Sequence, residues 1–235
     1  MGSLLNKKYP EGRLTIRNTF NINSCDLRVL PEEFIALGCK PSFNVYGRES
    51  LLLDGRSVET RAAGGHIHLA VKEIGASPED YSEIIKTIDA IAGIMAVSLA
   101  EKFDDPLRRR YYGRAGEYRI TTYGIEYRAL SNFWLASKQI AYLVLELVRA
   151  SVFVGVLGLR PLVLVTEEEV EDIINSGDVT RARIVLKRNE VFLRALIKGL
   201  FRHGYVADRI HEDARLEKET WDTIKRGMEY FDGDL

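Results

Sequence analysis

The stretch EYRITTYGIEYRAL, residues 117–130, decides which fold this chain can adopt. Polar and apolar residues alternate on both sides of a central glycine, which predicts two short strands joined by a turn. Glu117 and Arg119 share one face of the first strand, and Glu126 and Arg128 share one face of the second. Carboxylates and guanidinium groups on rigid backbone suit a divalent cation and phosphate. Cross-strand Glu–Arg pairing on a solvated face is the alternative that the pattern leaves open.

An arginine-rich run, DDPLRRRYYGRAG, precedes these strands and adds Arg108, Arg109, Arg110 and Arg114. The run is expected to end a helix and to form a basic loop directed at an anionic ligand. Its alternative is an arginine-rich turn beside a solvated face. Nucleic-acid binding through this run is not expected, because the run is short and the net charge of the chain is -1.

Upstream, residues 64–71 read GGHIHLAV and predict a further strand. His66 and His68 share one face of it, whereas Ile67, Leu69 and the following valine share the other. The Gly-Gly pair allows a close backbone approach to a ligand, or simply forms the turn before the strand. Two histidines alone do not make a metal site, and a half-exposed polar face is the alternative.

The remaining patterns are mostly helical. Ser77 as N-cap and Pro78 as first helical residue predict a helix whose apolar positions face the core. These positions are Ile84, Ile85, Ile88, Ile91, Met95 and Leu99. Helices dominate from Ser137 onward, with a capping box formed by Thr166 and Glu169, and with two last helices over 190–204 and 212–231. Strands crowd the first half and helices the second, so we expect one α+β domain over residues 1–235.

Composition narrows the class of protein. The chain has 235 residues, of which 46% are hydrophobic and 29% charged, as in ordinary globular proteins. Its two cysteines form no Cys-x-x-Cys pair, and its N-terminus does not read as a signal peptide. The most apolar stretch, 140–165, is interrupted by Glu146, Arg149 and Arg160, which favours a buried helix followed by a strand-like piece over a membrane span. We therefore expect a cytoplasmic protein with no membrane partner.

Three stretches together resemble the phage-type carboxylate–amine ligase (amidoligase) family, a compact relative of glutamine synthetase and glutamate–cysteine ligase. They are AGGHIHLAV at residues 63–71, RRRYYGRAGEYRITTYGIEYRALSNFWL at 108–135 and CKPSFNVYGRE at 39–49. The resemblance covers roughly residues 20 to 150, and its long second motif is the most specific.

This resemblance implies an antiparallel sheet of the glutamine synthetase catalytic type, with helices packed on one face and a helical C-terminal part. It also implies a ligase that uses ATP and Mg²⁺ to form an amide or peptide-like bond through an acyl phosphate. By the same resemblance His66 and Glu126 bind metal, and His68 touches the nucleotide phosphate. The arginines that it assigns to phosphate and substrate carboxylate are Arg114, Arg119 and Arg128.

The chain departs from the family pattern in its acids. Members usually carry acidic strands well upstream of the cysteine–proline segment, whereas residues 6–18 of this chain hold one acid, Glu11, and Lys40 and Ser42 stand where aspartates are expected. Because Mg²⁺ favours several oxygen ligands, one glutamate and one histidine underfill its shell. Another chain of an oligomer could supply the missing acids, or the chain could be a fragment that needs an upstream half. The alternative is a non-catalytic binding or structural module that retains the fold, for example in a virion. The ligase is preferred, in the host cytoplasm or the virion, with small-molecule or peptide carboxylate and amine substrates.

Overall fold

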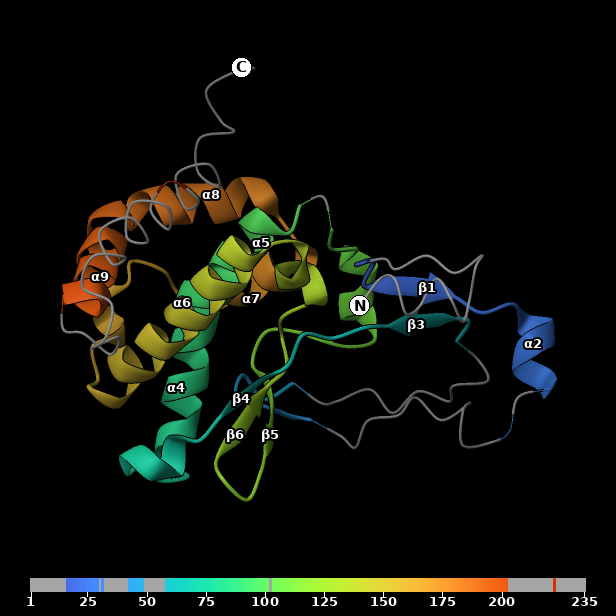
Figure 1. Ribbon diagram of the computed structural model, residues 1–235, viewed down its shortest axis with the longest axis horizontal. Helices are drawn as coiled ribbons and strands as arrows, with labels where there is room; N and C mark the ends of the chain where they lie inside the picture. Colours follow the sequence, from blue (N-terminus) through green and yellow to red (C-terminus); the bar gives the residue numbers. More distant parts are fainter. Residues whose placement is uncertain are drawn as a thin grey trace, which may run out of the picture.

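A computed structural model describes residues 16–29, 31, 42–48, 58–101, 103–202 and 222 of the chain. Figure 1 shows the long helices gathered at one end, with the strands that carry the polar motifs beside helix α4. A smaller two-stranded ribbon and a short helix lie at the other end. Residues 39–41 and 49 of the cysteine–proline segment, Glu11, and the helix expected over 212–231 (apart from residue 222) lie outside the described residues.

Four strands form an antiparallel sheet in the order β2-β5-β6-β4. Their bounds are Phe43–Asn44 (β2), Glu117–Ile120 (β5), Ile125–Tyr127 (β6) and Ile67–Leu69 (β4). The hairpin predicted from residues 117–130 is thus present, and its turn places Arg119 opposite Glu126. Strand β4 lies on the other side of β6, where His68 is opposite the same glutamate.

The two faces of this sheet differ in character. Leu69, Ile125 and Tyr127 are buried and belong to the main hydrophobic core, together with the isoleucines of α4. Because side chains alternate along a strand, His68, Arg119 and Glu126 lie on the opposite face. The structure therefore has the mixed helix and antiparallel-sheet composition that the sequence predicted.

A separate two-stranded ribbon pairs β1, Thr19–Asn21, with β3, Thr60–Ala62. A short helix, α2, spans Ser24–Val29. The ribbon is tied to the rest of the chain because the side chain of Asn18 donates to Asp104 and the hydroxyl of Thr19 donates to Asp105.

The first long helical segment begins two residues later than expected. It consists of α4 (Asp80–Ile88), a π-helical turn η2 (Asp89–Gly93) and α5 (Ile94–Leu99), after a short 3-10 helix η1 (Val71–Ile74). Ser77 is not a side-chain cap, because its N–H and hydroxyl both donate to the Asp80 carboxylate. The apolar stripe does face the core, since the four isoleucines and Met95 are at most 1% exposed and Leu99 packs against it.

Two 3-10 helices flank the hairpin, η3 (Pro106–Arg110) before it and η4 (Asn132–Ala136) after it. From Ser137 onward the described chain is mostly helical, as predicted, with α6 (Lys138–Val156), η5 (Arg160–Leu162), α7 (Glu167–Ser176), α8 (Val179–Arg188) and α9 (Glu190–Arg202). The Thr166 hydroxyl accepts from the N–H of Glu169 at 3.1 Å, which confirms the Thr166 half of the predicted capping box. The strand-like piece expected near residue 163 is not a strand. Residues 157–165 are all described, and they form the 3-10 turn η5 followed by extended chain that pairs with no strand.

Helix α6 is long and apolar enough, by length and composition, to cross a membrane. However, 56% of its most apolar window is buried inside the protein, and it packs along α4. A buried core helix passes the same test of length and composition.

Candidate functional site

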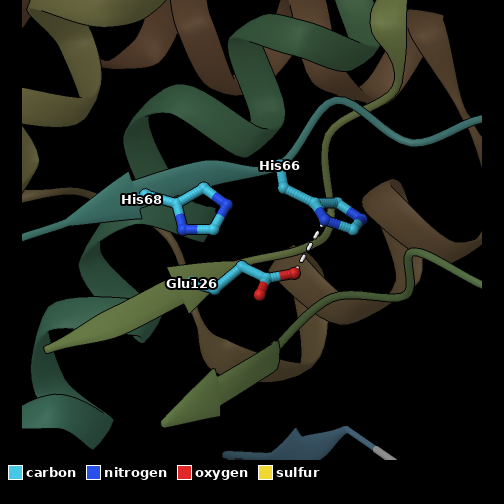
Figure 2. A group of neighbouring side chains, drawn as sticks. All are labelled: His66, His68 and Glu126. Carbon is cyan, nitrogen blue, oxygen red and sulfur yellow. Dashed lines mark ion pairs between the residues drawn. The ribbon is translucent and has the colours of Figure 1, made fainter. Parts of the chain in front are cut away.

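Two imidazoles and one carboxylate meet on the polar face of the sheet. His66 lies just before β4, His68 lies within it, and Glu126 lies in the centre of β6. One ligand atom from each of the three lies within 4.8 Å of those of the other two. Figure 2 shows both rings and the carboxylate gathered over the strands, with the His66–Glu126 pair marked.

Glu126 is the centre of the site. Its side chain is 1% exposed and pairs with three neighbours: His66 Nδ1 at 2.7 Å, Arg119 Nη2 at 2.5 Å and Arg128 Nε at 3.5 Å. Burial acts to raise the pKa of Glu126, but the Arg119 hydrogen bond, the electrostatic interaction with neighbouring His66 and the charges of Arg119 and Arg128 outweigh it. The net pKa is lowered, so Glu126 is an anion at neutral pH.

The pKa of His66 is lowered as well. Its largest cause is burial, which penalises the imidazolium, and Arg128, Arg119 and His68 act in the same direction while Glu126 opposes them. His66 is therefore neutral at pH 7 and keeps a lone pair, which is the form that binds metal.

Arg128 is fully buried and held rigidly. Its Nε and Nη2 both donate to the Tyr112 hydroxyl at 3.2 Å, and its guanidinium lies 4.9 Å from the centre of the Tyr112 ring. Its Nη1 donates to the Ser42 hydroxyl at 2.8 Å, at the position where the resemblance implied an aspartate. The same tyrosine ring lies 5.5 Å from the ring of His66, so Tyr112 joins the arginine to the histidine.

The Gly-Gly pair before the histidines allows close contact with the protein's own chain. A Cβ on Gly65 would lie 2.1 Å from the Ser131 carbonyl oxygen and 2.4 Å from Trp134 Nε1. A Cβ on Gly64 would lie 2.8 Å from both His66 Nε2 and the Tyr112 ring. The pair therefore packs the turn that positions His66.

The arginine-rich run does not form the expected basic loop. Arg108 and Arg109 are buried in η3 and pair with Asp104, at 3.5 Å and 2.7 Å. Arg108 also donates to the carbonyl of Ala129, and burial lowers its pKa to about 10. Both the anion-directed loop and the solvated turn are thus wrong for these two residues, which brace β6 and the ribbon instead.

Arg114 also faces the chain. Its Nε donates to the carbonyl of Arg109 at 3.0 Å and its Nη2 to that of Arg110 at 3.2 Å. Among the described residues, none of its hydrogen bonds reaches His66, His68 or Glu126, so its role in binding phosphate or substrate stays a prediction. Glu117 is buried too, accepts from the N–H of Gly113 at 2.9 Å, and has a pKa raised by burial.

Behind the sheet lies a carboxylate that sequence reasoning missed. Asp89, in the π-helical turn, accepts from the Tyr127 hydroxyl at 2.5 Å and from the N–H of Gly116 at 2.6 Å. It is fully buried, and desolvation raises its pKa from 3.8 to about 7, although hydrogen bonds from Tyr127, Gly116 and Tyr46 oppose this. Asp89 thus ties both site strands to the helices. The sequence signal that could have indicated this buried acid is its position within the isoleucine-rich stripe of the predicted helix.

Tyr112 and Tyr123 were missed as well. Tyr123, at the tip of the hairpin, contacts His68 Nδ1 through its hydroxyl, and the two rings lie 5.9 Å apart. Tyrosines in a loop carry no spacing signal, because their partners are far away in the sequence. Together the site offers one buried carboxylate, two imidazoles and two arginines, a set that can bind a cation and an anionic ligand side by side.

Comparison with known proteins adds one match. The sequence model of the family described as "Phage phiEco32-like COOH.NH2 ligase-type 2" matches residues 50–157. This range contains every residue of the site described above except Ser42. No curated protein and no solved structure matches the chain.

Proposed function

Because the chain belongs, through residues 50–157, to the phage-type carboxylate–amine ligase family, we propose that it is an ATP-dependent ligase that joins a carboxylate to an amine. The observation that carries the proposal is the placement of Glu126, between His66 on one side and Arg119 and Arg128 on the other. A catalyst of phosphoryl transfer needs cationic groups fixed around the transferring phosphoryl group.

The reaction has two steps. An oxygen of the substrate carboxylate attacks the γ-phosphorus of ATP, the bond to the β,γ-bridging oxygen breaks, and an acyl phosphate and ADP result. The amine then attacks the acyl carbon, phosphate leaves, and the amine loses a proton as the amide forms. Tight positioning is essential to both steps, because water competes with the amine for the acyl phosphate.

The arginines have different parts in this scheme. Arg119 is 35% exposed on its side chain and can rotate from Glu126 toward an oxygen of phosphate or of the substrate carboxylate. Arg128 is fully buried behind it, so it provides a fixed positive potential and holds Tyr112 and Glu126 in place. When no metal ion is bound, exposed His68 donates to a phosphate oxygen from Nε2, since its Nδ1 contacts Tyr123.

Magnesium does not fit the described residues on their own. Mg²⁺ prefers near-octahedral oxygen ligands, whereas the cluster offers two nitrogens and one oxygen. The single carboxylate is also neutralised by two guanidinium groups. A role for Mg²⁺, bound with ATP, therefore requires acidic ligands from another chain or from outside the described residues, and no step above is assigned to it.

The second candidate is a non-catalytic binding or structural module that keeps the ligase fold, for instance in a virion. The observation that favours it is the same shortage of carboxylates in the described site. We place the ligase first because a purely structural sheet has no need for a buried glutamate beside a histidine and two arginines. On either view the protein acts in the host cytoplasm or the virion.

Hydroxylamine trapping tests the ligase directly. Purified chain is incubated with ATP, Mg²⁺, hydroxylamine and pools of amino acids and dicarboxylates, and hydroxamate and ADP are measured. We expect carboxylate-dependent formation of both, lost in Arg119→Gln and kept in Arg194→Gln, which removes an exposed arginine of α9. Absence of both products, also in extracts that contain every other phage protein, would leave the structural module.

A further inference from the structure

The three-donor cluster has a composition that the proposed function does not explain. Two of its three donors are imidazoles: His66 lies just before β4, and His68 lies within it. Imidazole nitrogens favour zinc, iron, nickel and copper, whereas carboxylate and carbonyl oxygens favour magnesium and calcium. The donor set thus has the chemistry of a transition-metal site.

The carboxylate is arranged to give one oxygen to such an ion. Glu126 Oε2 is taken by Arg119, whose Nε and Nη2 donate to it at 3.0 Å and 2.5 Å. Glu126 Oε1 is buried, and within the described residues it has no hydrogen-bond partner. It lies 2.7 Å from His66 Nδ1 without the geometry of a hydrogen bond and 3.5 Å from Arg128 Nε, so an ion held by both Oε1 and Nδ1 would complete the shell of this oxygen.

His68 is oriented by a partner outside the cluster. The Tyr123 hydroxyl contacts its Nδ1, which leaves Nε2 for a ligand. A hydrogen bond on the second nitrogen is the usual way in which proteins fix the tautomer and direction of a metal-binding histidine.

The neighbouring arginines make the site less favourable for a hard cation such as Mg²⁺ than for a transition-metal ion. Arg119 and Arg128 lie within 3.5 Å of the carboxylate and reduce its charge. A hard ion such as Mg²⁺ depends on anionic oxygens and gains little here, whereas a transition ion is bound mainly through the two imidazole nitrogens.

We propose that His66, His68 and Glu126 form a three-ligand site for a divalent transition ion of the zinc or iron(II) class, with Mg²⁺ excluded. Two histidines and one carboxylate are a recurrent ligand set for both ions, and it leaves coordination positions open. With two arginines beside it, an open position suits an oxygen of a phosphate or carboxylate ligand. The inference goes beyond the proposed function, because it predicts metal binding by the chain without nucleotide.

The test is metal binding by the full chain after removal of metals with a chelator. Zn²⁺, Co²⁺ and Mg²⁺ are titrated separately by calorimetry, and Co²⁺ is also followed by its visible absorption. We expect one Zn²⁺ per chain, a Co²⁺ spectrum that Zn²⁺ abolishes, and no Mg²⁺ binding under the same conditions.

Variants separate the ligands from the fold. His68→Gln changes an exposed residue and is expected to lose Zn²⁺ affinity by more than the roughly tenfold to hundredfold that loss of an outer hydrogen-bond partner causes. Tyr123→Phe removes the outer hydrogen-bond partner of His68, so its loss of Zn²⁺ affinity is expected to stay within roughly tenfold to hundredfold. Glu190→Gln on α9 is the control, and its Zn²⁺ affinity should not change. Mg²⁺ bound as tightly as Zn²⁺, or unchanged Zn²⁺ binding in His68→Gln, would overturn the inference.

ATP titrated into the same preparations keeps the two proposals apart. Binding of Zn²⁺ without any binding of ATP would support the metal site and contradict the proposed ligase function. Binding of Mg-ATP and formation of hydroxamate, without any binding of Zn²⁺, would support the ligase function and contradict the transition-metal site.

Discussion

The carboxylate of Asp89 lies 2.5 Å from the hydroxyl of Tyr127, across the boundary between the helical layer and the sheet. Tyr127 follows Glu126 directly in β6, and its side chain points to the opposite face. The same carboxylate accepts from the N–H of Gly116, just before β5. One buried acid in a π-helical turn therefore fixes the two strands that carry Glu126 and Arg119, and π turns are frequent near functional sites.

The pH dependence of stability tests this link. The pKa of Asp89 rises from 3.8 in the unfolded chain to about 7 in the folded protein, so the folded protein binds more protons between these values. The contribution of Asp89 protonation to the free energy of unfolding is fully present below about pH 4. It is lost as the pH rises to about 7, a change on the order of 4 kcal/mol. In Asp89→Asn this dependence is absent. Urea unfolding at pH 4 and pH 8 should therefore show the advantage of the wild type over the variant shrinking with pH, and a constant difference would contradict the raised pKa.

Removing the other partner tests the hydrogen bond itself. Tyr127→Phe leaves a buried carboxylate short of one donor and is expected to lower the free energy of unfolding by about 1–3 kcal/mol. Tyr118→Phe is the matched control, since Tyr118 is opposite Tyr127 in the sheet and its hydroxyl makes no hydrogen bond with another described residue. We expect the control to stay within about 0.5 kcal/mol. Equal losses in the two variants would mean that ring packing alone holds β6.

Close packing at the turn before β4 gives a third test. Gly65→Ala places a Cβ 2.1 Å from the Ser131 carbonyl oxygen, so the backbone must shift and His66 with it. We expect the variant to unfold at lower urea concentration and to lose metal binding. Gly199→Ala in α9, where no described atom lies within 4 Å of the new Cβ, should be stabilised by about 0.5–1 kcal/mol. Normal metal binding in Gly65→Ala would show that the turn does not position His66.

Much of the site followed from the sequence because alternation is a local property. The pattern of residues 117–130 predicted the hairpin, and it placed Arg119 and Glu126 on the face that His68 also occupies. The helix carrying Ile84 and Ile88 followed for the same reason, since its apolar positions repeat within one segment. These features depend only on neighbours in the chain.

The parts that the sequence did not predict depend on distant partners. Arg108 looked like a ligand-binding cation, yet Asp104 and the carbonyl of Ala129 make it a buried brace. Asp89 lies within the predicted helix, and only the folded chain brings it to Tyr127 and Gly116. Charge alone does not indicate whether a residue faces a ligand or the protein's own backbone.

The most direct test of the account is the affinity of the chain for ATP, measured by calorimetry in the wild type, Arg119→Gln and Arg194→Gln. Arg119 is part exposed, so its loss should leave the fold intact while it removes a charge-assisted bond to phosphate. We expect saturable binding that is unchanged in Arg194→Gln and at least about tenfold weaker in Arg119→Gln, since such a bond contributes roughly 1.5–3 kcal/mol. Absence of ATP binding by the wild type, or equal affinity in all three proteins, would contradict it.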